Sequence, residues 1–333
     1  MESSSCRSVH LPLELLSEVL TRLPVKSLLR FKCVSKFWVD LINTPYFISS
    51  HLHNYSKRRR RINIIQLRLQ RRYNNDGCFR TLHLDSAGNQ YTAEARNLTV
   101  PLYDPGDENH YVFVAGTGTC NGLLCLWLPE EPLVFWNPST HQYRHGPILE
   151  CSTNCGFGYD QNSQDYKFAT MIYTIPIKFR YTCKMYSLKS GSWCYQHVFD
   201  SDSIPVGTAF VCNGAVYWAF TKGVPFEYSY RDSWRLDCLD NSLCGLFRVG
   251  EQFDVWMRKN DDWSKLFSIN QSVNACSGTM SVKLLAYAED GRKVLISKSW
   301  ALHWYDIQEK TLHKIDVVHA ADSTKLSESL VPL

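Results

Sequence analysis

No apolar run in this 333-residue sequence approaches the roughly 20 residues that a helix needs to cross a bilayer. The first residues lack a basic segment followed by an unbroken apolar stretch and a small-residue cleavage site, so a secretory signal is not expected. CxxC pairs are absent, and the 13 cysteines are odd in number and scattered, unlike the disulfide framework of a secreted domain. We therefore expect a cytoplasmic or nuclear protein, or one found in both, without membrane contact.

Catalytic signatures are equally missing. The sequence contains no GxSxG, P-loop or HExxH motif, and no GxGxxG follows an expected strand. One cluster, His141, His145, Cys151 and Cys155, has the ligand types of a zinc site, but its order and spacing match no common zinc finger. We therefore predict no catalytic residue, no metal, no cofactor and no enzymatic activity.

Apolar and aromatic residues, by contrast, are plentiful. They make up 44% and 13% of the chain, which is enough for a large buried core and typical of β structure. The net charge is +4, but residues 57–72 hold eight basic residues and no acid, so the rest of the chain is net negative. This distribution argues against a nucleic-acid partner. The basic run is a nuclear import signal, an anion-binding patch or a solvated linker that ends where a strand is expected from Ile62.

Helical spacing is confined to the N-terminal part of the chain. Pro12 suits a first helical turn, Glu14 favours the positive end of the helix dipole, and Pro24 ends the first helix. Its apolar residues recur three and four positions apart: Leu15, Leu16, Val19, Leu20 and Leu23. A second helical stretch is expected from about Val25 to Ile42. Because some 40 residues cannot enclose so many large apolar side chains, the surplus must dock on the following domain, as a helical cap, or on another protein.

A close resemblance to the F-box, the helical module that binds the Skp1 adaptor of cullin-based ubiquitin ligases, runs from His10 to Phe47. The matching motifs are Leu11-Pro12, Leu23-Pro24, Leu28-Leu29-Arg30 and Cys33-Val34-Ser35-Lys36. The resemblance implies about three helices and a contact with Skp1. The residues that it places against the adaptor are Leu11, Pro12, Leu15, Leu16, Leu20, Pro24, Leu28, Leu29 and Val34. Aliphatic anchors on short helices are what a helix-in-groove interface uses.

After residue 62 one unit recurs four times. In each copy an aromatic residue ends a strand, a polar turn follows, and a second bulky residue lies seven positions later. The four pairs are Trp136 and Tyr143, Tyr186 and Trp193, Trp256 and Trp263, and Tyr305 and Leu312. The first members lie 50, 70 and 49 residues apart, and intervals near 50 are typical of kelch-type propeller blades. About 270 residues at ~45 per blade allow roughly six blades, with a β-sandwich built from the same hairpins as the alternative.

The second half, residues 95–333, resembles the F-box-associated domain of plant F-box proteins. Motif-like stretches are Gly118–Cys125, Val134–Thr140, Gly156–Asp160, Asn213–Trp218 and Phe253–Phe267. One departure lies between Trp218 and Leu243, where the family usually carries a further strand pair and this chain has a short aromatic stretch. Either a blade is degenerate there or a variable loop replaces it. The candidate target contacts in this stretch are Phe226, Tyr228, Tyr230 and Trp234, and an ordinary packed loop is the alternative.

The sequence thus predicts an α+β multidomain chain with an all-α F-box at 8–50, a basic linker and first strand at 51–72, and an all-β, propeller-like domain at 73–333. The resemblance implies a non-catalytic, substrate-recognition subunit of an SCF (Skp1–cullin–F-box) E3 ubiquitin ligase. Its partners would be a Skp1-type adaptor, through it the cullin and RING subunits, and an unknown target protein. The alternatives are an interaction scaffold outside any ligase and a glycoprotein-binding receptor whose exposed Trp and Tyr side chains stack on sugars.

Overall fold

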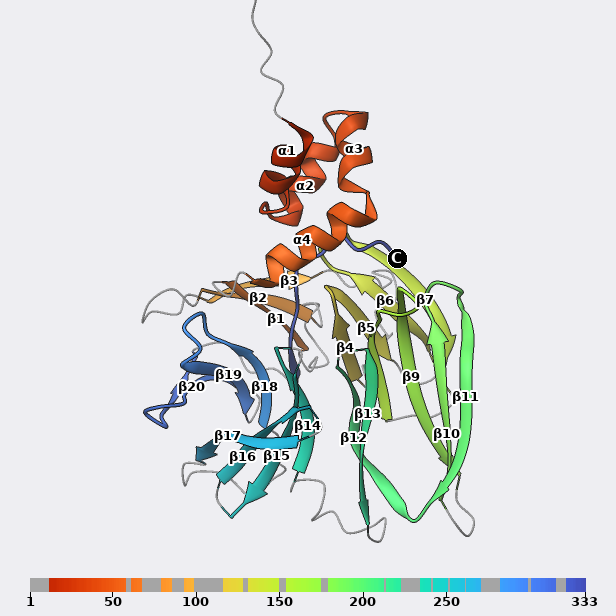
Figure 1. The fold of residues 1–333 in the computed structure, drawn as a ribbon, viewed down its shortest axis with the longest axis vertical. Coiled ribbons are helices and arrows are strands. Elements are labelled where there is room, and N and C mark those ends of the chain that lie inside the picture. Colours follow the sequence, from red (N-terminus) through yellow and green to blue (C-terminus); the bar gives the residue numbers. More distant parts are fainter. Residues whose placement is uncertain are drawn as a thin grey trace, which may run out of the picture.

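A module of short helices stands on one end of a ring of β-sheets (Figure 1). The computed structural model describes residues 12–57, 61–67, 79–85, 93–98, 116–127, 131–149, 154–174, 179–212, 214–222, 234–240, 242–250, 252–260, 262–270, 282–298, 301–315 and 322–333. The expected order, an all-α module followed by an all-β propeller, is confirmed.

The N-terminal module contains four helices, one more than expected: α1 (Leu13–Leu20), α2 (Val25–Lys32), α3 (Lys36–Ile42) and α4 (Pro45–Lys57). Pro12 and Pro24 lie just before α1 and α2, where a missing N–H costs no helical hydrogen bond. The second helical stretch is interrupted, contrary to expectation, at Ser35. Its Oγ accepts a hydrogen bond from the Trp38 N–H (3.5 Å) and so begins a new helix. The last helix, α4, continues past residue 50 to Lys57.

Five antiparallel sheets of four strands form the blades of the propeller. Blade 1 has the order β22 (Asp322–Lys325), β1 (Arg61–Leu67), β2 (Phe79–Asp85), β3 (Ala93–Leu98). Blade 2 consists of β4 (Gly116–Cys120), β5 (Leu123–Trp127), β6 (Pro132–Asn137) and β7 (Gln142–Ile148). Blade 3 consists of β8 (Asn154–Asp160), β9 (Asp165–Thr174), β10 (Phe179–Ser187) and β11 (Ser192–Ser201). Blade 4 consists of β14 (Trp234–Leu239), β15 (Ser242–Val249), β16 (Gln252–Lys259) and β17 (Asp262–Asn270), and blade 5 of β18 (Val282–Tyr287), β19 (Lys293–Lys298), β20 (Ala301–Asp306) and β21 (Leu312–Lys314).

A sixth, smaller sheet completes the ring. It contains only β12 (Ser203–Cys212) and β13 (Ala215–Lys222) within the described residues, and it lies between blades 3 and 4 (Figure 1). β12 contacts β8 on one side and β14 on the other. Among the residues that the structure describes, the 70-residue interval between Tyr186 and Trp256 therefore contains a two-stranded sheet besides β11, β14 and β15. The expected six positions are occupied by five full blades and this pair of strands.

The recurring aromatic unit of the sequence marks one place in four blades. Its first members, Trp136, Tyr186, Trp256 and Tyr305, all lie in the third strand, on β6, β10, β16 and β20. The bulky residue seven positions later lies directly opposite in three blades, in the pairs Trp136–Tyr143, Tyr186–Trp193 and Tyr305–Leu312. In blade 4 the two strands stay paired as far as Lys259 and Asp262, so the turn is shorter and Trp263 lies opposite Arg258. The repeat is therefore the hairpin that joins the third and fourth strands.

The core lies between blades, because a single sheet cannot cover its own apolar faces. Between blades 2 and 3 the rings of Phe135 and Tyr186 stack with centroids 6.1 Å apart. Between blades 4 and 5, Phe267 stacks on Tyr305 at 5.9 Å, and the Tyr305 hydroxyl donates to the Ser268 carbonyl. Trp136 and Trp304 are among the largest fully buried side chains. Each aromatic pair adds about 0.5–1.5 kcal/mol beyond the area that it buries.

The ring is closed by the C-terminal part of the chain. β22 pairs antiparallel with β1, from Ile64 opposite Lys325 to Leu67 opposite Asp322. The Thr119 hydroxyl of β4 donates to the Lys325 carbonyl at 3.0 Å, which joins the next blade to the closing strand. Blade 1 therefore contains the first strand of the propeller and the last.

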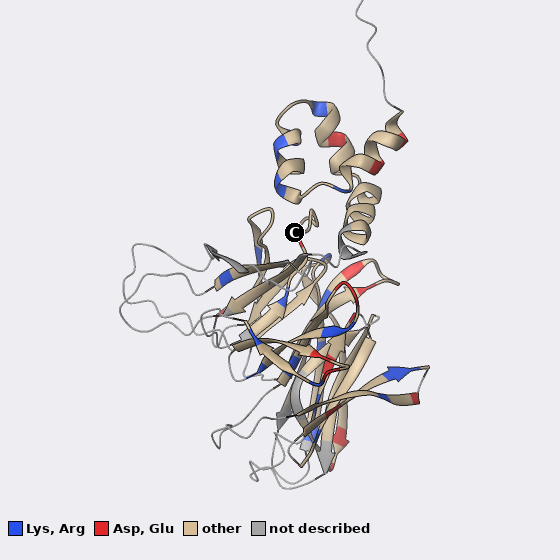
Figure 2. Cartoon of the chain, turned by 90° about the vertical axis from the view of Figure 1, so that its left-hand side faces the viewer, with Lys and Arg blue, Asp and Glu red and all other residues tan. Residues whose placement is uncertain are grey.

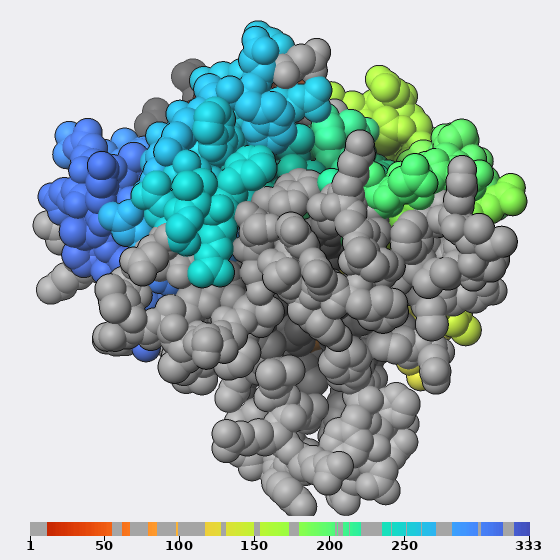
Figure 3. Space-filling model, turned by 90° about the horizontal axis from the view of Figure 1, so that it is seen from below, coloured from red at the N-terminus to blue at the C-terminus, as the bar shows by residue number. Residues whose placement is uncertain are grey.

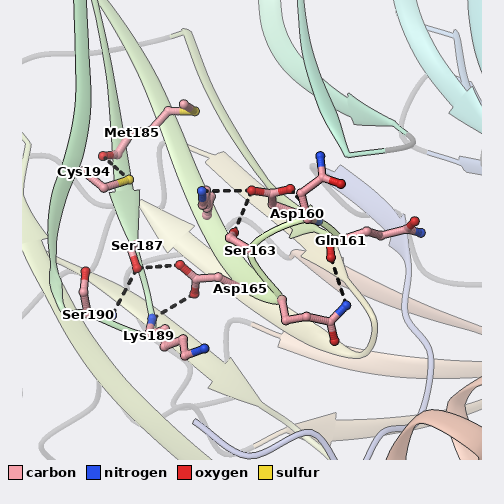
Figure 4. Close-up of polar contacts among 12 residues, drawn as sticks. Asp160, Gln161, Ser163, Asp165, Met185, Ser187, Lys189, Ser190 and Cys194 are labelled. Carbon is pink, nitrogen blue, oxygen red and sulfur yellow. Dashed lines mark hydrogen bonds and ion pairs between the residues drawn. The ribbon is translucent and has the colours of Figure 1, made fainter.

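Two carboxylates fix the turns of blade 3 (Figure 4). Asp165 accepts hydrogen bonds from the Ser187 hydroxyl (2.5 Å) and the Lys189 N–H (2.9 Å), which ties β9 to the β10–β11 turn. Asp160 accepts from the Ser163 hydroxyl at 2.6 Å and forms an ion pair with Lys167 at 2.9 Å. These hydrogen bonds from Ser163 and Lys167 lower the pKa of the Asp160 carboxyl to about 2.

We expect replacement of Asp160 by Asn to make stability less dependent on pH. A carboxyl group whose pKa is lower in the folded chain than in the unfolded one stabilises above its unfolded pKa, and this stabilisation is lost as the pH falls through the folded value. The urea midpoint of Asp160→Asn should lie below that of the unsubstituted chain at neutral pH, and the gap should narrow from about pH 4 to about pH 2. The exposed Asp202 offers a matched control, Asp202→Asn, which should leave the midpoint unchanged. A gap that stays constant across this pH range would contradict the assignment.

Candidate interaction surfaces

The helical module has its own apolar core, which takes up part of the leucine-rich sequence. Its buried members are Leu20, Val25, Leu28, Ile42, Phe47 and, from the C-terminus of the chain, Leu330. Leu28, Ile42 and Phe47 are fully buried. The four helices thus pack on one another and on the tail.

A second group of large apolar side chains stays outside this core. On α1, the exposed fractions are 48% for Leu13, 51% for Leu15 and 60% for Val19. Val34, in the turn after α2, is 69% exposed, and Phe37 of α3 is 52% exposed. We call these five residues the exposed apolar set. So many large apolar side chains in water on about 25 residues are typical of an interaction site.

The structure divides the nine residues that the F-box resemblance places against Skp1. Pro12, Leu15, Pro24 and Val34 are exposed, and Leu16 and Leu29 are half-buried against the module's core. Leu20 and Leu28 are 3% and 0% exposed, so they have almost no surface left to give to a partner. They hold the helices in place behind the exposed residues. Leu11 lies outside the described residues.

Three members of the exposed apolar set are not among the nine residues that the F-box resemblance places against Skp1. Val19 follows Leu15 by four positions and therefore shares its side of α1. Leu13 and Phe37 carried no such signal, because only the packing of the four helices decides which apolar residues the module's core can hold. Charge is also unevenly spread: in Figure 2 the acidic residues of α1 and the basic residues of the other helices lie mainly on different sides of the module.

The C-terminal tail fastens the module to the propeller. Leu330 is buried among the helices, while Val331 is buried in the same apolar cluster as Phe135 and Leu133 of blade 2. The Asn137 side-chain amide at the end of β6 donates to the carbonyls of Ser329 (3.1 Å) and Val331 (2.8 Å). One short segment therefore contacts both domains.

Polar contacts strengthen this joint. The Glu328 carboxylate accepts a hydrogen bond from the Val25 N–H at 3.3 Å, at the first turn of α2. Within the module, a ring nitrogen of His51 lies 2.9 Å from the Leu23 carbonyl, and the Asn54 amide donates to the Thr21 hydroxyl. These bonds tie the loop before α2 to α4, the helix nearest the propeller. The module and the ring are therefore held in one fixed orientation.

A cavity of about 850 Å³ lies in the centre of the ring, below α4. Charged residues on its wall include Arg235, Asp237, Asp240, Lys283 and Lys325. Asp237 accepts hydrogen bonds from the Leu284 N–H (2.7 Å) and the Cys238 N–H (2.9 Å) and so joins blade 4 to blade 5. Burial raises the pKa of this carboxyl, and the nearby cations Arg235 and Lys283 oppose the rise. Asp240 forms an ion pair with Lys325 at 3.5 Å, so both carboxylates serve joints of the ring.

Most of the four candidate target contacts lie in segments that the structure does not describe. Phe226, Tyr228 and Tyr230 lie outside the described residues, and Trp234 begins β14, opposite Phe247 of β15. Their role stays a prediction. Of the four possible zinc ligands, Cys151 lies outside the described residues, His145 packs its ring on Tyr143 and Cys155 is buried beside Thr170. Across the part of the chain that is described, no group of three His, Cys, Asp or Glu side chains has the arrangement of a metal site.

Known proteins agree with this architecture. Residues 9–50 match the F-box domain, and residues 96–242 match the F-box associated beta propeller domain. The F-box protein CPR1 of Arabidopsis thaliana is 24% identical, in an alignment that covers 92% of this chain and 84% of that protein. An F-box/kelch-repeat protein of the same plant is 28% identical, over 78% of this chain and 79% of its own length.

A helical F-box ahead of a β-propeller defines an F-box protein. The chain belongs to the plant F-box proteins that carry an F-box-associated domain. Its F-box implies an adaptor of the Skp1 type, and the pair of domains is typical of non-catalytic adaptor subunits. None of the helices in the described residues is long and apolar enough to cross a membrane.

The division between core and exposed leucines can be tested with two matched substitutions. Leu28→Ala should destabilise the helical module by about 2–5 kcal/mol, because it removes a fully buried side chain and leaves a cavity. Leu15→Ala should change stability by about 0.5 kcal/mol or less, because that side chain is half in water. Hydrogen exchange of the α1–α3 amides measures both. Equal losses from the two substitutions would contradict the division.

Proposed function

We propose that this chain is the substrate-recognition subunit of an SCF E3 ubiquitin ligase. Its helical module would bind a Skp1-type adaptor and its propeller a target protein, which would then be ubiquitinated. The observation that carries the proposal is the exposed apolar set on the F-box: five large apolar side chains that neither the module nor the propeller covers.

The adaptor surface combines the exposed apolar set with its neighbours. Leu15 and Val34 would lie at the contact, together with Pro12, Pro24 and the exposed edges of Leu16 and Leu29. Each large aliphatic side chain that is fully buried contributes about 1.5–3 kcal/mol before the entropy cost of association is subtracted. Leu20 and Leu28 would support the interface from below.

The mechanism requires only proximity. In the complete ligase, the cullin and RING subunits would bring a ubiquitin-loaded E2 enzyme near the target, and the target's lysines would attack the E2 thioester. This chain supplies no group to that reaction. Its contribution is a high effective concentration of target at the E2, and the fixed orientation of module and ring keeps this concentration high. We expect such assembly in the cytoplasm, the nucleus or both.

The experiment measures binding of the full chain to purified Skp1 by calorimetry. Leu15→Asp and Val34→Asp, made singly, should each weaken binding at least about tenfold, because a charge replaces an apolar anchor at the contact. The matched control is Ile148→Asp on β7: this residue is 59% exposed but lies in blade 2. The control should bind as the unsubstituted chain does.

One result would contradict the proposed function. If the unsubstituted chain, folded by circular dichroism and by a cooperative melt, binds no Skp1, the ligase assignment is wrong. An interaction scaffold outside any ligase or a glycoprotein receptor would then account for the same domains. Saturable binding on a glycan array, lost when exposed aromatics are replaced, would identify the receptor.

A further inference from the structure

Two cysteines from different sheets meet where the two-stranded sheet contacts blade 4. Cys212 is the last residue of β12 and Cys238 lies on β14, and their Sγ atoms are 3.6 Å apart. We propose that this pair is a reversible oxidation site, at which a small hydroperoxide converts the two thiols into a disulfide that links the two sheets. The site is independent of the proposed adaptor contact, because neither cysteine belongs to the helical module.

The alternation of side chains along β14 turns Cys238 toward its partner. Asp237 and Cys238 are consecutive residues of the strand, so their side chains point to opposite sides. Asp237 accepts the hydrogen bond from the Leu284 N–H of blade 5, and Cys238 contacts Cys212 on the side of the two-stranded sheet. β12 contacts β14 along this boundary, and Figure 3 shows green and cyan segments of the two regions side by side at the rim. The pair therefore lies at the boundary between two separate sheets.

The distance between the two sulfurs suits disulfide formation. An S–S bond is about 2.0 Å long, so the Sγ atoms of the pair must approach each other by roughly 1.6 Å. Small rotations about the two Cα–Cβ bonds cover much of this distance. Both cysteines lie near the ends of their strands, where the backbone is less constrained than in the middle of a sheet and can supply the rest.

A hydrogen bond makes Cys212 the more reactive of the two thiols. The Cys238 S–H donates to the Cys212 sulfur, and this bond lowers the pKa of Cys212 although burial opposes the change. On the neighbouring strand β15, by contrast, burial raises the pKa of the Cys244 thiol to about 12. Because the thiolate is the nucleophile that attacks an oxidant, Cys212 reacts first and Cys238 second.

A small oxidant has room to approach the pair. Cys238 is half-buried and lines the central cavity of about 850 Å³. Phe210 and Val211, which precede Cys212 on β12, line the same cavity. Cys212 itself is only 4% exposed, so a bulky reagent is kept away from its sulfur. Hydrogen peroxide, which is not much larger than a water molecule, is the kind of oxidant that this site favours.

The reaction balances in two steps. The Cys212 thiolate attacks one oxygen of hydrogen peroxide and the O–O bond breaks, so that Cys212 becomes a sulfenic acid and the released hydroxide takes up the thiol proton to form water. The Cys238 sulfur then attacks the Cys212 sulfur, the S–O bond breaks, and the hydroxyl group leaves with the Cys238 proton as a second water. The two thiols lose two electrons and the peroxide gains them. A thiol reductant reverses the oxidation by thiol–disulfide exchange.

The disulfide would change how blade 4 is held in the ring. It would join residues 26 positions apart, and closing a segment of that length restricts the unfolded chain and so stabilises the folded one. β14 would then be fastened to the two-stranded sheet by Cys238 and to blade 5 by Asp237. In the cytoplasm or nucleus, where we expect the protein, thiols are kept reduced. The link would therefore form only under oxidising conditions, as a switch and not as a permanent part of the fold.

The test exposes the reduced full chain to hydrogen peroxide, blocks the remaining thiols with iodoacetamide and digests the monomer with trypsin. Trypsin releases Cys212 in residues 190–222 and Cys238 in residues 236–248, because a Lys or Arg lies just before each segment and at its end. Mass spectrometry should detect these two peptides linked to each other, and dithiothreitol should separate them. The oxidised chain should also melt at a higher temperature than the reduced chain.

The same two peptides supply matched controls. Each contains a second cysteine, namely Cys194, which is exposed on β11, and Cys244, which is buried on β15. Cys212→Ser and Cys238→Ser should each abolish the linked peptides and the rise in melting temperature. Cys194→Ser and Cys244→Ser should leave both unchanged.

Three results would overturn the inference. The first is a peroxide-treated chain without linked peptides, in which both thiols are alkylated or one is oxidised alone. The second is a link that persists in Cys212→Ser or Cys238→Ser, and the third is a link that disappears in Cys194→Ser or Cys244→Ser. If a variant of the pair does not fold, the double variant of Cys194 and Cys244 still decides, because a link between its two peptides can join only Cys212 and Cys238.

Discussion

The C-terminal dozen residues hold the molecule together. β22 pairs with β1 and closes the ring, and the residues after it leave the propeller and enter the helical module, where Leu330 is buried. Asn137 of blade 2 binds the carbonyls of this tail on its way. The propeller would be an open row of blades without β22, and the F-box would be joined to it only through α4 and the connection to β1. Ring closure and domain orientation therefore depend on the same short segment.

Much of the architecture could be predicted from the sequence because it follows from local rules. Helical spacing before residue 57 and alternation after residue 61 separate the two domains. The aromatic unit around Trp136, Tyr186, Trp256 and Tyr305 marks the hairpin between the third and fourth strands of four blades. In each of these blades the third strand carries a large aromatic residue near its end and the chain turns back into the fourth strand. The two bulky residues of the unit are therefore always seven positions apart in the sequence.

What could not be predicted depends on contacts between distant parts of the chain. Leu20 and Leu28 have the same residue type and helical spacing as Leu15, yet they are buried because the other helices and Leu330 cover them. The spacing of apolar residues shows which of them share one side of a helix, but it does not show which side the rest of the chain buries. The stop at Ser35 was available in the sequence as a capping residue before a helix, but the apolar residues on both sides of it obscured the break. The β12–β13 sheet had only an indirect signal, the long interval between Tyr186 and Trp256.

The position of the closing strand has a consequence for synthesis on the ribosome. All four helices of the F-box have been synthesised by residue 57, whereas Leu330 of the module's core follows only near the end of the propeller, so the exposed apolar set is available early. The ring cannot close until β22 has been synthesised, and the tail cannot anchor the module until Leu330 has followed it. A nascent or prematurely terminated chain would therefore expose the apolar set of the F-box without a closed propeller behind it. Translation order thus separates the appearance of the exposed apolar set from the closure of the ring.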